Sequence, residues 1–492
     1  MKKSRLFNSI HPLLLVALYS ITLGVSYLAY FSEPAAKDGF MTMRWVVFLL
    51  LFPILAKFII QLFTISVYSF SERSREKRHK LNGDESVSVL IPAWNEEVGI
   101  IKTINSVLAS DYENLEVIVI NDGSTDSTDE LITRYLHEYE QLDHSKKTLK
   151  YISKENGGKA RALNEALKIC TGEFVVTIDA DCLIDKDAIT NTLRRFGSKK
   201  VGAVGGNIIV GNKKKTIELV QQLEYLYGFF FKRADSVFNS VYIIGGAAAA
   251  YRKSVLDEVG GFDESVVTED IEMSMRILSH GYKTRYAYDA ITYTEGPSRW
   301  KCFFNQRLRW RFGRFQTFIK HRHLFFSGDS THNRYFTFLL LPIALYAEFT
   351  LFFQVFFLAL FYTYTFVTQD YMPLVFMIVF MATMVCLQIL FDSKSHFHLN
   401  LLLLAPIAWL VFYIVDFVEL QALFRSLKRL VKQEDLAWQK WARVGLAGNG
   451  QETTAPSPPS DELSEEPFIR RDGRFFIYQL LNMKKHKENN NM

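Results

Sequence analysis

The sequence predicts a membrane protein in which an α/β domain stands between two groups of apolar helices. The 492 residues are 49% apolar, and long charge-poor runs lie near both ends of the chain. Between about residues 86 and 293, short runs of β-forming residues alternate with helical patterns, which is typical of a mainly parallel sheet covered by helices. This division disfavours both an entirely soluble protein and a transporter built only of membrane spans.

The N-terminal residues predict a hairpin of two spans. An apolar run from about His11 to Phe31 is about 20 residues long, which suits a span better than the shorter core of a signal peptide. A second run, from about Trp45 to Phe70, contains one charge, Lys57. Basic residues before the first run and after the second predict that both ends lie inside, so the chain after Lys80 is expected to be cytoplasmic. Residues 1–83 form this unit, two helices and a basic linker.

Residues 84–298 are expected to be a cytoplasmic α/β domain. The β-rich runs are bounded by turn residues, and the helical runs between them have apolar residues at helical spacing. The predicted strands are Val87–Ile91, Leu115–Asn121 and Phe174–Asp179, and the predicted helices lie within Val98–Ala109, Asp126–Glu140 and Ala160–Thr171.

Residues 299–330 predict amphipathic helices in the plane of the membrane interface. Apolar side chains recur at helical spacing, and basic side chains are interleaved with them. The apolar set is Phe304, Leu308, Phe312, Phe315 and Ile319, and the basic set is Arg307, Arg311, Arg314 and Lys320. A core helix of the α/β domain is the alternative, and the position directly before an apolar run favours the interface.

Residues 331–432 are expected to hold the C-terminal transmembrane helices, from runs at about Tyr335–Val367, Met372–Phe391 and Leu399–Phe424. Acids inside such runs, here Glu348 and Asp416, mark a cavity or a partner. Three single spans would place the basic end of the last run outside, against the positive-inside rule. Either one run is re-entrant or interfacial, or the first contains a double pass, or the rule fails.

The C-terminal tail, residues 433–492, contains a stretch rich in Pro, Ser, Glu and Thr at 447–467, which predicts a flexible linker. The net charge of +5 is mild, and we expect no nucleic-acid partner. The four cysteines match neither a disulfide framework nor a zinc pattern, so they are interpreted as reduced thiols of a cytosol-facing protein.

Acidic side chains follow two of the predicted strands. Asp179 and Asp181 stand two residues apart at the end of one strand, and Asp122 follows another. Ligands bind at the C-terminal ends of strands in open parallel sheets. Mg²⁺ or Mn²⁺ prefers oxygen ligands and can bridge such carboxylates to a diphosphate. Alone, each pattern is weak, because Asp122 could equally cap the following helix.

Four further motifs carry groups suited to a nucleotide ligand. Glycines let a backbone approach a ligand closely, a lysine or arginine supplies charge for phosphate, and a tryptophan offers a flat face to a sugar ring. An acid at a helix start, such as Asp270, could otherwise be only a cap. The motifs are Leu90–Glu97, Asn156–Asn164, Thr268–Asp270 and Gln306–Trp310.

Taken together and in this order, the motifs resemble the hallmark of the processive family-2 inverting glycosyltransferases, D…DxD…TED…QxxRW. These include cellulose, chitin, hyaluronan and poly-N-acetylglucosamine synthases. The matching residues are Asp122, Asp179, Asp181, Thr268–Asp270 and Gln306-x-x-Arg309-Trp310. The resemblance covers residues 85–315 by motif and implies a nucleotide-sugar-binding domain of GT-A type beside a transmembrane channel.

The resemblance also implies roles for the donor-binding residues. Ala93, Glu96 and Asp122 would line the uridine pocket. Lys159 would help to hold the nucleotide. Asp179 and Asp181 would hold the ribose or donor sugar and a Mg²⁺ or Mn²⁺ ion, with Asp181 the favoured ligand.

Catalytic and acceptor roles follow in the same way. Asp270 would be the general base, with Glu269 beside it in the catalytic motif. Gln306 and Arg309 would bind the donor diphosphate, and Trp310 the acceptor end of the chain. Small residues at Gly246 and Ala247 could leave room for the acceptor sugar, or could reflect close packing of the core.

The resemblance implies a glycosyltransferase that polymerises N-acetylglucosamine from UDP-GlcNAc and passes the chain across the plasma membrane. Two N-terminal spans, Glu348-Phe349 in a late span and about three late spans are similar to the poly-β-1,6-N-acetylglucosamine synthase branch. Members of that branch use a small membrane subunit, which makes such a partner an expectation here. The alternatives are a hyaluronan or chitin synthase, or a non-processive enzyme that glycosylates lipids.

Overall fold

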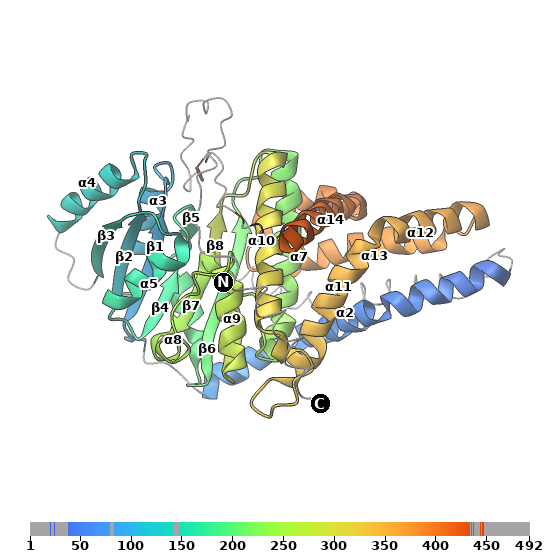
Figure 1. Cartoon of the computed structure of the whole chain (residues 1–492), viewed down its shortest axis with the longest axis horizontal. Helices are drawn as coiled ribbons and strands as arrows, with labels where there is room; N and C mark the ends of the chain where they lie inside the picture. The colour runs from blue at the N-terminus through green and yellow to red at the C-terminus, as the bar shows by residue number, and fades with distance from the viewer. Residues whose placement is uncertain are drawn as a thin grey trace, which may run out of the picture.

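The computed structural model describes Ser20, Gly24 and residues 38–78, 83–141 and 147–432, together with Glu434, Leu436, Arg443, Gly445 and Leu446. The first predicted span, apart from two single residues, and the linker at 447–467 lie outside the described residues. Figure 1 shows an α/β domain on one side and a group of long helices extending from its other side.

The α/β domain is built on an eight-stranded mixed sheet with the order β3-β2-β1-β4-β7-β6-β8-β5. Strands β3, β2, β1 and β4 pair in parallel, as do β6 and β8, whereas β7 and β5 run antiparallel to their neighbours. The strands are β1 (Val87–Ala93), β2 (Leu115–Asp122), β3 (Lys147–Lys154), β4 (Phe174–Thr177), β5 (Cys182–Ile184), β6 (Val201–Val210), β7 (Ala249–Arg252) and β8 (Lys283–Thr294).

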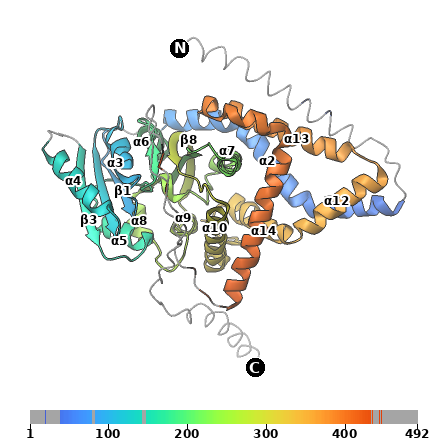
Figure 2. The ribbon, with the colours of Figure 1, turned by 90° about the horizontal axis from the view of Figure 1, so that it is seen from above.

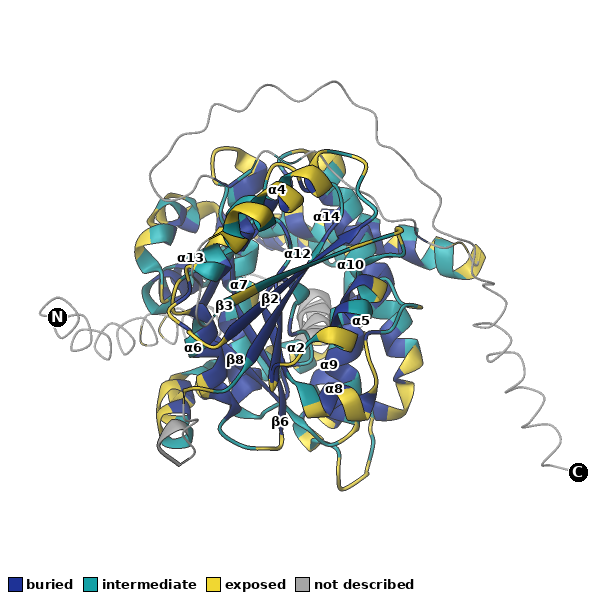
Figure 3. Cartoon of the chain, turned by 90° about the vertical axis from the view of Figure 1, so that its left-hand side faces the viewer, coloured by how far each residue is buried: buried dark blue, intermediate teal, exposed yellow. Residues whose placement is uncertain are grey.

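Helices cover both faces of this sheet. Strand β1 alternates, because Val89 and Ile91 pack in one core cluster with α3, whereas Leu90 packs in the other with α5. Figure 3 shows the buried strands between helices whose outer faces are exposed. The covering helices are α3 (Ile100–Leu108), α4 (Thr128–Glu140), α5 (Lys159–Ile169), α6 (Ala188–Leu193), α8 (Lys253–Val259) and α9 (Glu269–Ser279). The predicted fold class is therefore confirmed.

The remaining helices connect the sheet domain to the apolar part of the chain. Figures 1 and 2 place α7 and α10 next to the sheet, with α2, α11, α12 and α13 reaching away from it. They are α2 (Asp38–Arg78), α7 (Thr216–Val237), α10 (Trp300–Lys320), α11 (Leu341–Phe352), α12 (Gln354–Thr368), α13 (Met372–Phe391) and α14 (Ala408–Lys432), with a 3-10 segment η5 (Ser395–Ile407) before α14.

Three helical segments within the described residues are long and apolar enough to cross a membrane, at Phe52–Arg75, Met372–Phe391 and Ser395–Lys432. The pair Phe336–Phe352 and Gln354–Thr368 passes the same test together but is bent by 66°. The first late run, for which a double pass was one of the alternatives, is therefore broken near Phe353. These helices mark the chain as a membrane protein.

The stretch after Phe70, expected to be a linker, continues α2 as a helix to Arg78. It is held by the α/β domain, because Arg75 donates to the carbonyl of Val237 at 2.7 Å and the Tyr68 hydroxyl donates to the carbonyl of Tyr286 at 2.6 Å. The helix and the domain are thus joined by direct contacts.

Both ends of the last apolar run return to the α/β domain. Before it, Ser393 donates to the carbonyl of Tyr288 at 2.9 Å and Lys394 pairs with Asp185 at 2.7 Å. After it, Leu430 and Leu436 pack against α10. Figure 2 shows α14 running across the direction of α2 and α13. Which of the late runs cross the membrane stays a prediction, since the last run is also long and apolar enough to span.

Candidate active site

One cavity of about 1020 Å³ is lined by all of the residues that the sequence motifs singled out. It opens at the C-terminal ends of β1, β2 and β4 and extends to α7, α10 and α2. The predicted residues that line it are Ala93, Glu96, Asp122, Lys159, Asp179, Asp181, Gly246, Ala247, Glu269, Asp270, Gln306, Arg309 and Trp310. The fold thus brings them together, while their individual roles stay predictions.

Asp122 organises the glycine-rich loop beside it. Its carboxylate accepts hydrogen bonds from the backbone nitrogens of Gly157 at 3.0 Å and Gly158 at 2.7 Å, and it pairs with Lys154 at 2.5 Å. Gly158 has a φ of +88°, a conformation that favours glycine. The acid expected to meet uridine therefore also fixes the loop from which α5 and Lys159 begin.

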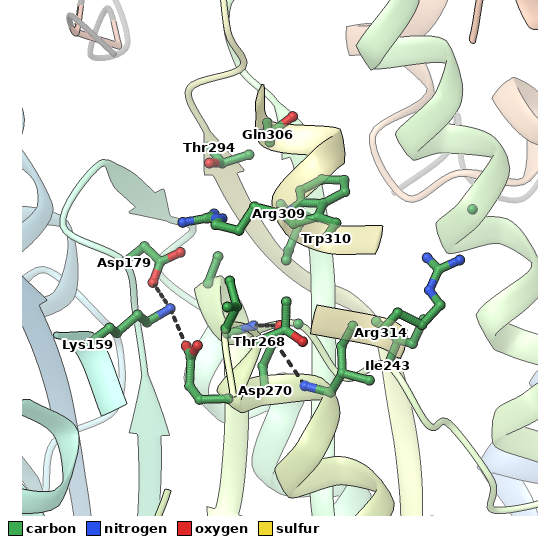
Figure 4. Close-up of a pocket in the computed structure, with 18 of the residues that line it drawn as sticks. Lys159, Asp179, Ile243, Thr268, Asp270, Thr294, Gln306, Arg309, Trp310 and Arg314 are labelled. Atoms are coloured by element: carbon green, nitrogen blue, oxygen red, sulfur yellow. Dashed lines mark hydrogen bonds and ion pairs between the residues drawn. The ribbon is translucent and has the colours of Figure 1, made fainter. Parts of the chain in front are cut away.

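Lys159 joins two of the predicted acids at the centre of the cavity. Its ammonium lies 2.6 Å from Asp179 and 3.0 Å from Glu269. Figure 4 shows Lys159 and Asp179 pointing toward each other. Burial alone would lower the pKa of Lys159, but the neighbouring acids raise it well above its usual value. Burial raises the pKa of Glu269 although Lys159 partly offsets the effect. The lysine thus stays charged and fixes two carboxylates beside the expected donor sugar.

Asp270 lies at the start of α9 and faces the same cavity. One carboxylate oxygen accepts a hydrogen bond from the backbone nitrogen of Gly246 at 2.9 Å, and the other accepts from that of Ile271 at 2.9 Å. A helix N-terminus stabilises a negative charge. These two hydrogen bonds fix the carboxylate at the cavity surface, where a general base must stand.

Gly246 and Ala247 are held in close packing. A Cβ added at Gly246 would come within 2.8 Å of the Lys159 nitrogen, so a side chain here would have to displace that ammonium. Ala247 is buried within the core cluster of the sheet. These contacts support close packing here, and room for an acceptor sugar stays a prediction.

Asp181 and Glu96 are bridged by a residue that sequence reasoning missed. The guanidinium of Arg443 lies 2.7 Å from Asp181 and 3.1 Å from Glu96. Ligand atoms of Asp179, Asp181 and Cys182 lie within 4.8 Å of one another, so these side chains could hold a metal ion. No motif near the chain end pointed to Arg443.

Helix α10 carries the Gln306, Arg309 and Trp310 side chains to the cavity, and Figure 4 shows Arg309 on the side of Asp179. The helix lies tightly against the catalytic loop. A Cβ added at Gly313 would overlap the side chain of Thr268, so glycine permits this close approach. The position of α10 thereby fixes the start of α9.

The basic residues of α10, expected to face an interface, include two that turn inward. Arg307 lies 2.7 Å from Glu224 of α7 and stacks over Trp310 at 4.2 Å. Arg311 pairs with Glu348 and Glu419. The end of the cavity next to the apolar helices is lined by Arg307, Arg311, Glu224 and Glu419, together with Lys57 and Gln61 of α2. The acid Glu348 inside an apolar run indicated that a partner existed, but only the fold identifies that partner as Arg311.

The comparisons with known proteins agree with this geometry. Residues 84–313 match the model of the family described as glycosyltransferase like family 2. The poly-beta-1,6-N-acetyl-D-glucosamine synthase of Staphylococcus aureus (strain COL) is 32% identical over 287 residues, covering 56% of this chain and 67% of that protein. The synthase of the same name from Staphylococcus epidermidis is 33% identical over 240 residues, covering 48% of this chain and 56% of that protein.

A solved mannosyltransferase from Pyrobaculum calidifontis, in complex with GDP-Man and Mn²⁺, covers 78% of this chain and 99% of its own, at 23% identity and a TM-score of 0.49. The assignment to a family rests on the family model and on the two synthases. The chain belongs to glycosyltransferase family 2 and is a membrane-associated glycosyltransferase.

Proposed function

We propose that this chain polymerises N-acetylglucosamine from UDP-GlcNAc and passes the product along its own helices across the plasma membrane. The observation that carries the proposal is the shared cavity, in which Asp122 and Asp179 at one end and Lys57 and Gln61 of α2 at the other line one space. The names of the relatives support the polymer. The catalytic domain would then face the cytoplasm, where nucleotide sugars are available.

In the proposed reaction, an acceptor hydroxyl attacks the anomeric carbon of the donor while UDP leaves, which inverts that carbon. Asp270 would accept the hydroxyl proton, because its carboxylate is held at the cavity surface by Gly246. Arg309 would pair with the leaving diphosphate, and Trp310 would stack against the acceptor sugar. Lys159 would keep Asp179 and Glu269 in place.

The residues present fit a divalent metal. Asp179 and Asp181 offer carboxylate oxygens, the ligands that Mg²⁺ and Mn²⁺ prefer. When bound, such an ion would offset the charge that develops on the leaving diphosphate. We expect an excess of chelator to stop UDP release by the purified protein, and Mg²⁺ or Mn²⁺ to restore it. Full activity in chelator would contradict a metal role for Asp181.

A donor screen tests the substrate and the product. Purified protein in nanodiscs is given UDP-GlcNAc, UDP-Glc and UDP-GlcA, singly and in pairs, and UDP release and product size are measured. We expect a long product from UDP-GlcNAc alone. Synthesis only with UDP-GlcNAc and UDP-GlcA together would indicate hyaluronan. A product that carries a single added sugar would show that the enzyme does not polymerise. Polymer from the purified chain alone would exclude a required accessory subunit.

A further inference from the structure

A cation from the far end of the chain lies in the donor half of the cavity. Arg443 follows α14, yet its guanidinium contacts Asp181 at 2.7 Å and Glu96 at 3.1 Å. These are the residues that we propose as metal ligand and nucleotide contact. The side chain of Arg443 is 14% exposed, so most of it is enclosed by the cavity wall.

Residues after Arg443 fix it to the catalytic domain. The backbone nitrogen of Gly445 donates to Glu295 at 2.8 Å, and Lys102 donates to the carbonyl of Leu446 at 3.0 Å. The side chain of Leu446 occupies the space in which Gly211 would carry a Cβ. Glu295 directly follows β8, Gly211 directly follows β6 and Lys102 lies in α3, so the contacts reach three separate parts of the sheet domain.

A residue before Arg443 is fixed as well. Leu436 is buried against Leu308 and Phe312 of α10, the helix that carries Arg309 and Trp310. Arg443 is therefore held from both sides, by α10 on one and by the sheet domain on the other. The position of its guanidinium follows from this attachment.

The charges explain why a cation is stable there. Asp181, Glu96 and Glu295 gather at this corner of the cavity, and burying such acids without a counter-charge is costly. Burial would lower the pKa of Arg443, but Asp181 and Glu96 raise it above its usual value, so the guanidinium stays charged. Arg443 thus neutralises acids that a divalent ion would otherwise neutralise.

A metal ion and Arg443 cannot both hold the same oxygen of Asp181. Mg²⁺ binds oxygen ligands at about 2.0–2.1 Å, which leaves no place for a guanidinium at hydrogen-bond distance on the same lone pair. We propose that Arg443 is an internal counter-ion that competes with a divalent metal for Asp181. This inference rests on the proposed metal role of Asp181.

The test measures Mn²⁺ binding to the full-length protein in detergent, without any nucleotide sugar, from the electron paramagnetic resonance signal of free Mn²⁺. Arg443→Gln removes the competing charge, and we expect it to bind Mn²⁺ about tenfold more tightly than the wild type, the size of one charged hydrogen bond. Arg443→Lys keeps the charge and should bind nearly as the wild type does. Arg429→Gln, which alters a pair with Glu434 at 4.0 Å, is the matched control and should change nothing.

Unchanged or weaker Mn²⁺ binding by Arg443→Gln would overturn the inference. Asp181→Asn separates this failure from a failure of the metal site itself, because it should lose the bound Mn²⁺. If Asp181→Asn loses Mn²⁺ and Arg443→Gln binds as the wild type does, only the counter-ion role fails. If Asp181→Asn keeps its Mn²⁺, the metal assignment and this inference both fail, whereas the donor screen still decides the glycosyltransferase reaction.

Discussion

The charged side chains at the two ends of the cavity are paired in different ways. At the donor end, one lysine and one arginine each bridge two acids, and these acids come from loops at strand ends and from the start of α9. At the end next to the apolar helices, arginines of one helix pair with acids of three others, α7, α11 and α14. On the inference drawn above, a metal ion competes with one cation of the first arrangement. The second joins four helices, so removing one member should affect the stability of the fold.

The sharpest test of this comparison is Asp270→Asn at the donor end. We expect UDP release to fall by about 10²–10⁴-fold, the usual contribution of a general base, while UDP binding stays nearly intact. Binding should survive because the carboxylate is held by Gly246 and Ile271 at the surface proposed for the acceptor. Activity and UDP affinity are measured side by side.

Asp257→Asn is the control for that variant, since this acid pairs with Lys253 on the exposed face of α8 and should leave both quantities unchanged. Near-normal polymer synthesis by Asp270→Asn would show that another group accepts the proton. If UDP affinity fell as much as activity did, Asp270 would be a donor-binding residue and not the general base.

At the other end, Glu348→Gln should act on stability. It removes the buried acid that pairs with both Arg311 and Arg314, although Arg311 keeps its pair with Glu419, and breaking a buried pair costs up to about 3–5 kcal/mol. We expect a clear fall in the thermal unfolding temperature of the protein in detergent. Glu434→Gln is the control, because that half-exposed acid pairs loosely with Arg429 and Lys432 and should cost less than about 1 kcal/mol. Equal unfolding temperatures for the two variants would show that the pairs between the α10 arginines and their acids do not stabilise the fold.

The same contrast explains what the sequence could predict. The donor end was predictable because short motifs lie at strand ends, and parallel strands β1, β2 and β4 bring those ends together. The strands and helices around them were predicted to within a few residues, because their apolar periods are strong. Asp179 lies just beyond β4, whose regular pairing ends at Thr177.

The rest depended on contacts between distant segments. Sequence periodicity located the arginines of α10 but could not tell an interface from a protein partner, since Glu224, Glu348 and Glu419 stand on three separate helices. The bend near Phe353 lies within an unbroken apolar run. Arg443 had no local signal, because its partners are hundreds of residues away.

A smaller effect is expected at the contact between α10 and the catalytic loop. Gly313→Ala raises helix propensity by about 1 kcal/mol, but its Cβ would press on Thr268, and such overpacking costs about 1–3 kcal/mol. We expect the unfolding temperature to change little while activity falls, because the start of α9 must shift. Gly228→Ala in α7 adds the same group where no atom of another element lies within 4 Å, so it should raise the unfolding temperature. Full activity of Gly313→Ala would show that the loop around Thr268 can shift without loss of catalysis.

The smallest effect concerns the pH dependence set by Glu269. Burial raises its pKa, so it should take up a proton at a higher pH than an ordinary glutamate and lose its pair with Lys159 as the pH falls. Wild type and Glu269→Gln should therefore have similar activity at low pH, and their ratio should grow as the pH rises through the raised pKa and then level off. Glu258→Gln, on an exposed acid that accepts a hydrogen bond from Tyr282, should give a ratio that does not vary with pH. A constant ratio for Glu269→Gln as well would mean that the charge on this residue does not matter, and the bridging role of Lys159 would then depend on Asp179 alone.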